Sequence, residues 1–168
     1  MAETVRPAIS TDADAIRTHL LDFFADVRAR FGDAAPLPDI SLEKIRLRMA
    51  APHIITIIEP GVGYCEVKVK EQESEVKVES LFPRGTDRRL LKPILDAALA
   101  EALLRYPHPR WRVWASFFYA VNAQGEADLG ESECRAWQPL FAGSTVRFDD
   151  TIGTWVIAST LGAVTGGR

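Results

Sequence analysis

The run EVKVESLFPRGTDRRLLKPILDAALAEALL, residues 75–104, changes its apolar period part-way along. Its first residues alternate valine with charged side chains, which is typical of a strand with one buried face. From Leu90 to Leu104, leucine, isoleucine and alanine recur every three or four residues, which predicts an amphipathic helix. Pro93 is compatible with this helix only in its first turn. The run therefore predicts a strand, a basic loop and a helix in that order.

A second alternating segment precedes this run and predicts an antiparallel hairpin. Tyr64–Lys70 and Glu75–Leu81 both place valines on one face and charged side chains on the other. Like charges opposite each other are unfavourable, so a register with Lys68 opposite Lys77 is disfavoured and registers slipped by two residues are expected. In those registers Glu79 faces either the first residue of the first strand or Lys68.

The segment after the long helix is rich in aromatic residues and predicts a central strand. Trp111–Val121 follows the helix after a proline-containing break. A strand, a crossover helix and a second strand normally form a right-handed unit with parallel, adjacent strands. Trp111–Val121 is therefore expected to lie parallel and adjacent to Glu75–Leu81.

The remaining elements complete an α+β fold with a mostly antiparallel central sheet of about seven strands, flanked by helices and containing one βαβ crossover. Residues 1–160 are expected to form a single domain, and residues 161–168 a poorly packed C-terminal tail. The other predicted elements are an extended piece at Val5–Ala8, a helix from Ser10 to Phe31, a helix between Ser41 and Pro52, a strand at Ile54–Ile58, a short helix before Gly143, and a final strand pair at Ser144–Phe148 and Thr154–Thr160.

The composition excludes several classes of protein. The chain has 168 residues, of which 47% are hydrophobic and 26% charged, with a net charge of −3. A chain so close to neutral is not expected to bind nucleic acid non-specifically. It has neither an apolar leader nor a run of 18 apolar residues, which argues against secretion and membrane spanning. Its two cysteines match no metal-ligand spacing, so we expect reduced thiols in a cytoplasmic protein without a metal site.

The order of the elements and three stretches of sequence resemble the GNAT superfamily of acyl-CoA-dependent N-acetyltransferases. The resemblance implies transfer of an acetyl group from acetyl-CoA to an amine on a small molecule or a peptide. The stretches are Val5–Ala8 with Asp12–Ile16, then Glu79–Pro83 followed at the family's spacing by Ile94–Ala102, and finally Asn122 with Leu140-Phe141.

The loop between the strand and the helix departs from the family's pattern. In GNAT proteins this loop carries Q/R-x-x-G-x-G/A, whose small residues let backbone amides close on the CoA pyrophosphate. Those positions are Thr86, Arg89 and Leu91 here, so both glycines are missing. The loop is instead basic, and its guanidinium groups are suited either to binding phosphate directly or to a solvated helix entrance. The cofactor-binding residues implied by the resemblance are Leu81, Arg84, Thr86, Arg88, Arg89 and Asn122.

The resemblance also implies catalytic roles. Glu79 takes the position of a general base, although it also fits an ordinary strand residue among solvated Glu and Lys neighbours such as Glu66. The family's general acid is usually a tyrosine after the fifth strand, but no tyrosine follows Tyr119. Cys134 is a candidate replacement, and its alternative interpretation is a small buried residue.

Two functions follow from these observations. One is an N-acyltransferase, which the preserved strand-to-helix spacing and the loop arginines favour. The other is a non-catalytic GNAT-fold interaction or assembly module with an unidentified protein partner, which the missing glycines and tyrosine favour. If CoA binds, its pyrophosphate should depend on Arg88 and Arg89. Both are expected at an exposed helix entrance, where their replacement by alanine leaves the melting temperature unchanged.

Overall fold

A computed structural model describes residues 4–31, 39–83, 87–116 and 128–162. These residues form a seven-stranded sheet in the order β1-β2-β3-β4-β5-β7-β6. The strands are β1 Arg6–Pro7, β2 Ile54–Glu59, β3 Gly63–Lys70, β4 Glu75–Phe82, β5 Arg110–Ser116, β6 Thr145–Asp149 and β7 Thr154–Gly162. The α-helices are α1 Ala13–Phe31, α2 Leu42–Ala50, α3 Lys92–Arg105 and α4 Asp128–Trp137, and the 3-10 helices are η1 Ser10–Asp12, η2 Glu71–Glu73, η3 Arg88–Leu91 and η4 Gln138–Leu140.

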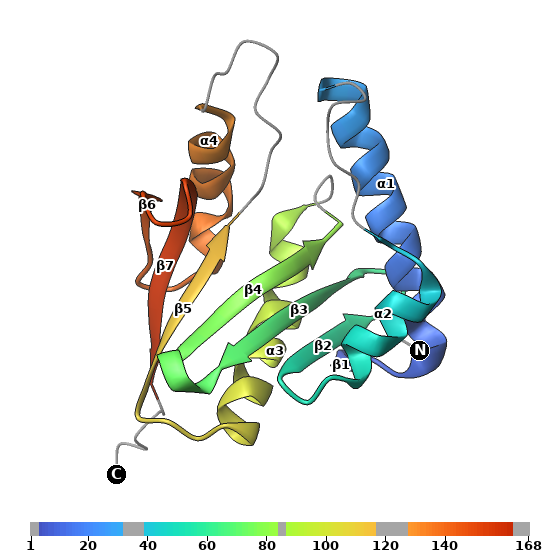
Figure 1. Ribbon diagram of the computed structural model, residues 1–168, viewed down its shortest axis with the longest axis horizontal. Helices are drawn as coiled ribbons and strands as arrows, with labels where there is room; N and C mark the ends of the chain where they lie inside the picture. The colour runs from blue at the N-terminus through green and yellow to red at the C-terminus, as the bar shows by residue number, and fades with distance from the viewer. Residues whose placement is uncertain (1–3, 32–38, 84–86, 117–127, 163–168) are drawn as a thin grey trace.

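The strand directions confirm the predicted fold class. β3 and β4 form the expected antiparallel hairpin, and β4 and β5 are adjacent and parallel. All other neighbouring strands of the sheet are antiparallel. The helix α3 connects β4 to β5 and makes the single βαβ crossover (Figure 1).

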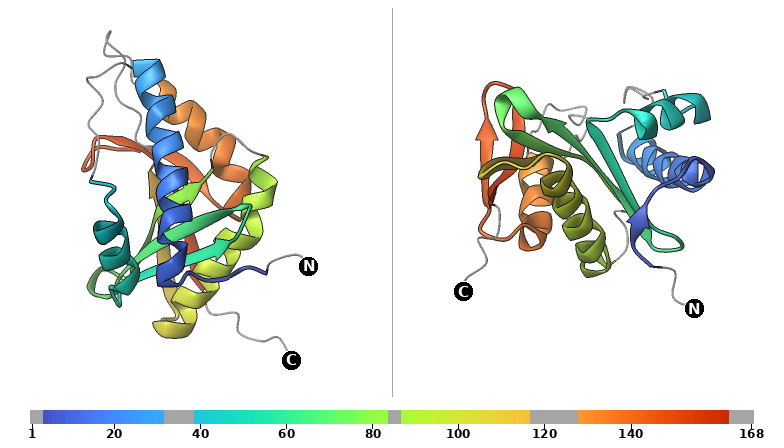
Figure 2. Two further views of the ribbon diagram at one scale, coloured as in Figure 1. Left: turned by 90° about the vertical axis from the view of Figure 1, so that its right-hand side faces the viewer. Right: turned by 90° about the horizontal axis from the view of Figure 1, so that it is seen from below.

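The helices cover the two faces of the sheet unequally. α3 and α4 pack on one face, and α1 and α2 lie on the other, over β1 to β4 (Figure 2). The larger core lies under α3 and α4, and Trp111 and Trp137 are among its fully buried side chains. A smaller core joins α1 and α2 to the sheet through Ile16, Ile45 and Phe82. The second face is therefore the one on which a cavity remains.

Local sequence signals explain where the helices begin. The Ser41 hydroxyl accepts a hydrogen bond from the Lys44 amide at 3.3 Å and caps α2. Pro93 lies in the first turn of α3, as the sequence requires, because proline lacks the amide that an interior position would need. Strand β7 runs to Gly162 and pairs with β5, so Leu161 and Gly162 belong to the sheet rather than to the expected tail.

The register of the β3–β4 hairpin differs from the prediction, because Lys68 lies directly opposite Lys77. A slip of two residues would keep the same faces buried, so burial does not select between these registers. The tight turn selects the observed register, because η2 and Ser74, with φ of 50°, close the hairpin on the pair Lys70 and Glu75. The expectation that Glu79 faces Lys68 or the start of β3 was wrong for the same reason.

Candidate functional site

Strands β4 and β5 separate at their C-terminal ends. Their pairing runs from Glu75 with Arg112 to Val78 with Ala115, and no later pair forms between them within the described residues. β4 continues to Phe82, and Figure 1 shows the two strands diverging beyond the paired part. The last half of β4 thus presents main-chain groups that no described strand pairs on the β5 side.

A β-bulge lies in the same part of β4. Glu66 pairs with Ser80 and Val67 pairs with Val78, so Glu79 is an extra residue with no partner on β3. A bulge of this kind re-aims side chains next to binding sites. Here Glu79 and Ser80 both reach the face that carries α1 and α2, where they line one cavity.

This cavity has a volume of about 430 Å³ and lies between α1, α2 and the ends of β3, β4 and β5. Much of its wall is apolar and comes from the helices, including Ile16, Phe23 and Met49. Its polar groups come chiefly from the strands and from α2. The volume falls in the range of small-molecule sites, which are mostly apolar with a few placed polar groups.

A partly buried ion pair forms part of the cavity wall. The Arg48 side chain donates from Nε to Glu66 Oε1 at 3.1 Å, and Glu66 is only 8% exposed. The hydrogen bond that Arg48 donates to Glu66 raises the pKa of Arg48 above its usual value, and the nearby Glu79 carboxylate adds to this. Interpreting Glu66 as a solvated neighbour was therefore wrong. The alternation along β3 hides it, because α2, far away in the sequence, covers this face.

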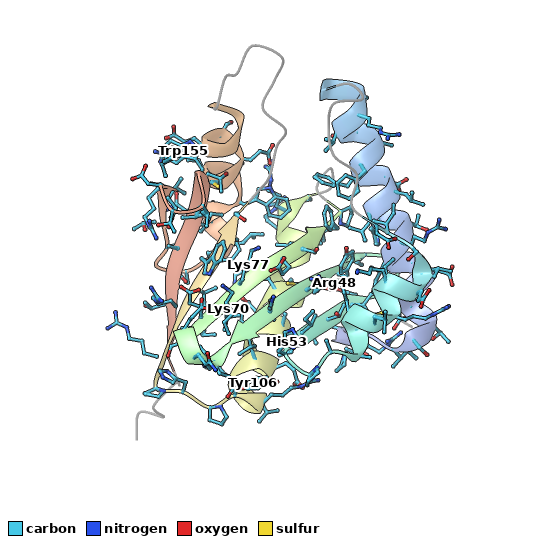
Figure 3. The ribbon with its side chains drawn as sticks, in the orientation of Figure 1. Arg48, His53, Lys70, Lys77, Tyr106 and Trp155 are labelled. Carbon is cyan, nitrogen blue, oxygen red and sulfur yellow. The ribbon has the colours of Figure 1, made fainter. Side chains whose placement is uncertain are left out.

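Glu79 occupies a partly enclosed position. Its side chain is 22% exposed, and the Lys77 ammonium lies 3.1 Å from Glu79 Oε1. The Lys77 ammonium also lies 5.0 Å from the ring centroid of Trp114 on β5. Figure 3 shows Lys77 and Arg48 on the same side of the sheet. Lys77, on the same strand, thus helps to position the Glu79 carboxylate at the cavity.

Ser116 ends β5 where the strands part. The residue is 6% exposed and lines the cavity, and its hydroxyl oxygen is buried without a hydrogen-bond partner. A buried hydroxyl in that state is uncommon, because burial without a partner costs free energy. Ser116 therefore places an unused hydrogen-bonding group beside the point where β4 and β5 part.

The helix entrance that follows the C-terminal end of β4 is capped by a carboxylate. Asp87 accepts a hydrogen bond from the Arg89 amide at 3.1 Å, and the Arg89 side chain binds the same carboxylate at 2.7 Å. These hydrogen bonds hold the pKa of Asp87 below its usual value. The Arg89 side chain is otherwise exposed, at 88%. An anion arriving here would meet a negative charge that already occupies the cap.

Arg88 does not share this exposure. Its guanidinium carbon lies 5.3 Å from the ring centroid of Trp137 on α4, and its Nε is buried without a hydrogen-bond partner. The expectation that Arg88 and Arg89 are equally exposed was wrong, because Trp137 of α4 lies against Arg88 while the Arg89 side chain is exposed. Leu91, where the family has a small residue, is fully buried in the core.

The remaining predicted residues are distributed as follows. The Leu81 side chain is buried in the core under α3 and α4, while its main chain lies on the part of β4 beyond the β5 pairing. Cys134 is also fully buried in that core and does not line the cavity. Arg84, Thr86 and Asn122 lie outside the described residues. The site therefore unites Glu79 and the Leu81 main chain but not Cys134.

The described part of the chain contains no group of three or more His, Cys, Asp or Glu residues able to hold a metal ion. None of the helices in that part is both long and apolar enough to cross a membrane.

The fold matches solved acetyltransferases along nearly the whole chain. One is yncA from Salmonella typhimurium, assigned as an acetyltransferase and solved with acetyl-CoA as its cofactor, with a TM-score of 0.58, 17% identity, and coverage of 100% of this chain and 98% of that one. Another is the aminoglycoside 6'-N-acetyltransferase from Enterococcus faecium, with a TM-score of 0.57, 9% identity, and coverage of 98% and 99%. The chain has the GNAT fold. No protein-family model and no curated protein matches its sequence.

Within the GNAT fold, strand geometry and side-chain packing produce three features of the site. They are the parting of β4 and β5, the bulge and the adjoining cavity. The helix entrance is the part that departs, because its glycine positions hold an exposed arginine, Arg89, and a buried leucine, Leu91. The helix entrance therefore differs more from the GNAT loop pattern than the bulged part of β4 does from the fold.

Proposed function

We propose that the protein is an N-acyltransferase that transfers an acetyl group from acetyl-CoA to an amine. The observation that carries this proposal is the bulge at Glu79, which directs a carboxylate into a cavity beside the point where β4 and β5 part. An acyl donor between the strands and an amine in the cavity would meet there. Holding both reactants in one geometry is a large part of catalysis for such a transfer.

Each residue of the site has its own role in this reaction. Bound acetyl-CoA supplies the thioester carbonyl that the amine attacks. Main-chain N–H groups near Leu81 stabilise the negative charge that develops on the carbonyl oxygen. The Glu79 carboxylate takes the proton from the attacking amine, directly or through one water. Lys77 positions that carboxylate, and the Ser116 hydroxyl gives the donor a hydrogen-bonding partner.

Protonation of the departing thiolate needs no buried acid. An ordinary thiol has a pKa of about 8.5, so a released thiolate takes a proton from water at neutral pH. Cys134 lies in the core away from the cavity, and we assign it no step.

Binding of the CoA pyrophosphate rests on side-chain charge. Arg88 is the strongest candidate, because its Nε lacks a hydrogen-bond partner at present. Arg84, Arg89 and Thr86 remain candidates on the same loop, and Asn122 on the segment after β5. Charge-assisted hydrogen bonds from guanidinium groups bind phosphate with bidentate geometry. The Asp87 carboxylate opposes this binding.

Calorimetric titration with acetyl-CoA and desulfo-CoA, together with thiol release in the presence of amines, tests the proposal. We expect saturable binding of both ligands and amine-dependent release of CoA. Absence of binding at millimolar acetyl-CoA would overturn it and would favour an interaction module built on the same fold.

A further inference from the structure

The cavity under α1 and α2 is lined by two chemically different groups of side chains. One group is aromatic: the Phe23 ring lies 4.9 Å from Phe82 and 5.1 Å from Phe24, and Phe82 lies 5.7 Å from Tyr64. All four of these residues line the cavity. Rings from two different layers of the molecule thus form a wall able to contact the face or edge of a ligand ring.

The other group of lining side chains is charged, and two of its carboxylates are already paired with cations. Glu66 is paired with Arg48, and Glu79 is paired with Lys77. The Glu66 side chain is nearly buried and is held in place by Arg48. The more exposed Glu79 side chain can bind one incoming amine. Across the whole described lining, only Asp39 adds a further carboxylate, and Lys44 adds a further cation near it in the sequence.

We propose that the acceptor is a small primary amine attached to a compact apolar body about the size of one or two rings. This inference rests on the proposed acyl transfer and names the substrate class of its acceptor cavity. The amine lies at Glu79, next to the parting of β4 and β5, and the apolar body lies against Phe23 and Phe24. A cavity of about 430 Å³ is large enough for such a molecule.

The same lining argues against polycationic acceptors. An aminoglycoside or a polyamine carries several ammonium groups, and each would need an unpaired carboxylate or open water. The described lining offers two carboxylates that are already paired, Asp39 as a third carboxylate with the cation Lys44 near it in the sequence, and an apolar wall. A polycation would therefore leave charges desolvated against phenylalanine rings. The acceptor of this chain should thus differ from that of the aminoglycoside acetyltransferase that shares its fold.

Binding of amines to the full chain, measured without any CoA, tests this inference directly. The probes are 2-phenylethylamine, ethylamine and spermidine, followed by calorimetry or ligand-observed NMR. We expect 2-phenylethylamine to bind at least about tenfold more tightly than either of the others, because only its ring removes apolar area from water. Equal affinities, or tightest binding of spermidine, would overturn the inference.

Matched variants place the ligand. Phe23→Leu keeps an apolar side chain but loses the ring, and we expect it to weaken 2-phenylethylamine binding about fivefold or more. Phe24→Leu serves as a second variant if the first melts early. The control is Phe148→Leu on β6, an exposed phenylalanine outside the cavity, which should leave the affinity unchanged. Loss of binding in the control, or none in either test variant, would place the ring elsewhere and overturn the assignment.

Failure of this inference and failure of the proposed function give different results. Binding of 2-phenylethylamine by a protein that does not bind acetyl-CoA would retain the acceptor cavity and remove the acyl transfer. Acetylation of spermidine but not of 2-phenylethylamine would retain the transfer and remove the substrate class.

Discussion

The cavity and the helix entrance, both near the C-terminal end of β4, differ in how they are built for a ligand. At the cavity, Glu79 and Ser116 lie beside aromatic rings and the Arg48–Glu66 pair, which packing holds in place. At the helix entrance, Asp87 fills the cap with the chain's own negative charge. The cavity is preorganised by packing, and the helix entrance depends on a balance of exposed charges. Acceptor binding should therefore respond to shape, whereas CoA binding should respond to charge and salt.

The largest effect on activity is expected at the cavity, from Glu79→Gln. Removing the base while keeping the shape should lower kcat/KM for amine acetylation by about 100-fold or more, because general-base catalysis contributes that much. Steady-state thiol release measures it. Glu75→Gln is the matched control, since Glu75 lies on the same strand, binds Arg112 and Lys70, and does not line the cavity. A loss below threefold in Glu79→Gln would remove the carboxylate from the mechanism.

The next effect is on stability, from Arg48→Met. This change leaves the Glu66 carboxylate buried without its partner, so we expect the free energy of unfolding to fall by about 2 kcal/mol. Arg46→Met, on the exposed side of the same helix, should change it by less than about 0.5 kcal/mol. Urea denaturation measures both variants. A deficit in Arg48→Met as small as that of Arg46→Met would mean that the ion pair does not stabilise this wall.

The fold could be predicted because its signals are local. The alternation along Glu75–Leu81, the helical period of Leu90–Leu104 and the capping residue Ser41 each act within a few residues, and the structure confirms all three elements. The crossover rule then placed β5 beside β4 in parallel, which is also confirmed.

The site could be predicted only in part, because its decisive features depend on contacts between distant segments. The bulge that releases Glu79 arises from a mismatch between β3 and β4 that neither strand shows alone. Glu66 is buried because α2 packs over it, and Arg88 is partly covered because Trp137 of α4 lies against it. No periodicity in the sequence reports these contacts.

A smaller effect separates the two arginines of the helix entrance. Arg88→Ala should lower the free energy of unfolding by about 1 kcal/mol, because it loses its stacking on Trp137. It should also weaken CoA binding about tenfold or more through loss of a charge-assisted contact. Arg89→Ala serves as the control, since its exposed side chain should leave the melting temperature unchanged. Thermal melts and calorimetry distinguish the two, and equal behaviour would contradict the observed difference in burial.

The smallest effect, and the one in the opposite direction, is expected from Asp87→Asn. Asparagine caps a helix about as well as aspartate, so the fold should keep its stability. The change removes the negative charge from the anion-binding end and frees Arg89 from its ion pair. We therefore expect acetyl-CoA to bind about two- to fivefold more tightly at low salt, with the gain shrinking as salt screens exposed charges. Asp14→Asn, in the first turn of α1, removes an equal charge from another helix start and should change nothing. Unchanged or weaker binding in Asp87→Asn would mean that the carboxylate orders the helix entrance for its ligand, and the contrast between a packed cavity and a charge-balanced helix entrance would no longer hold.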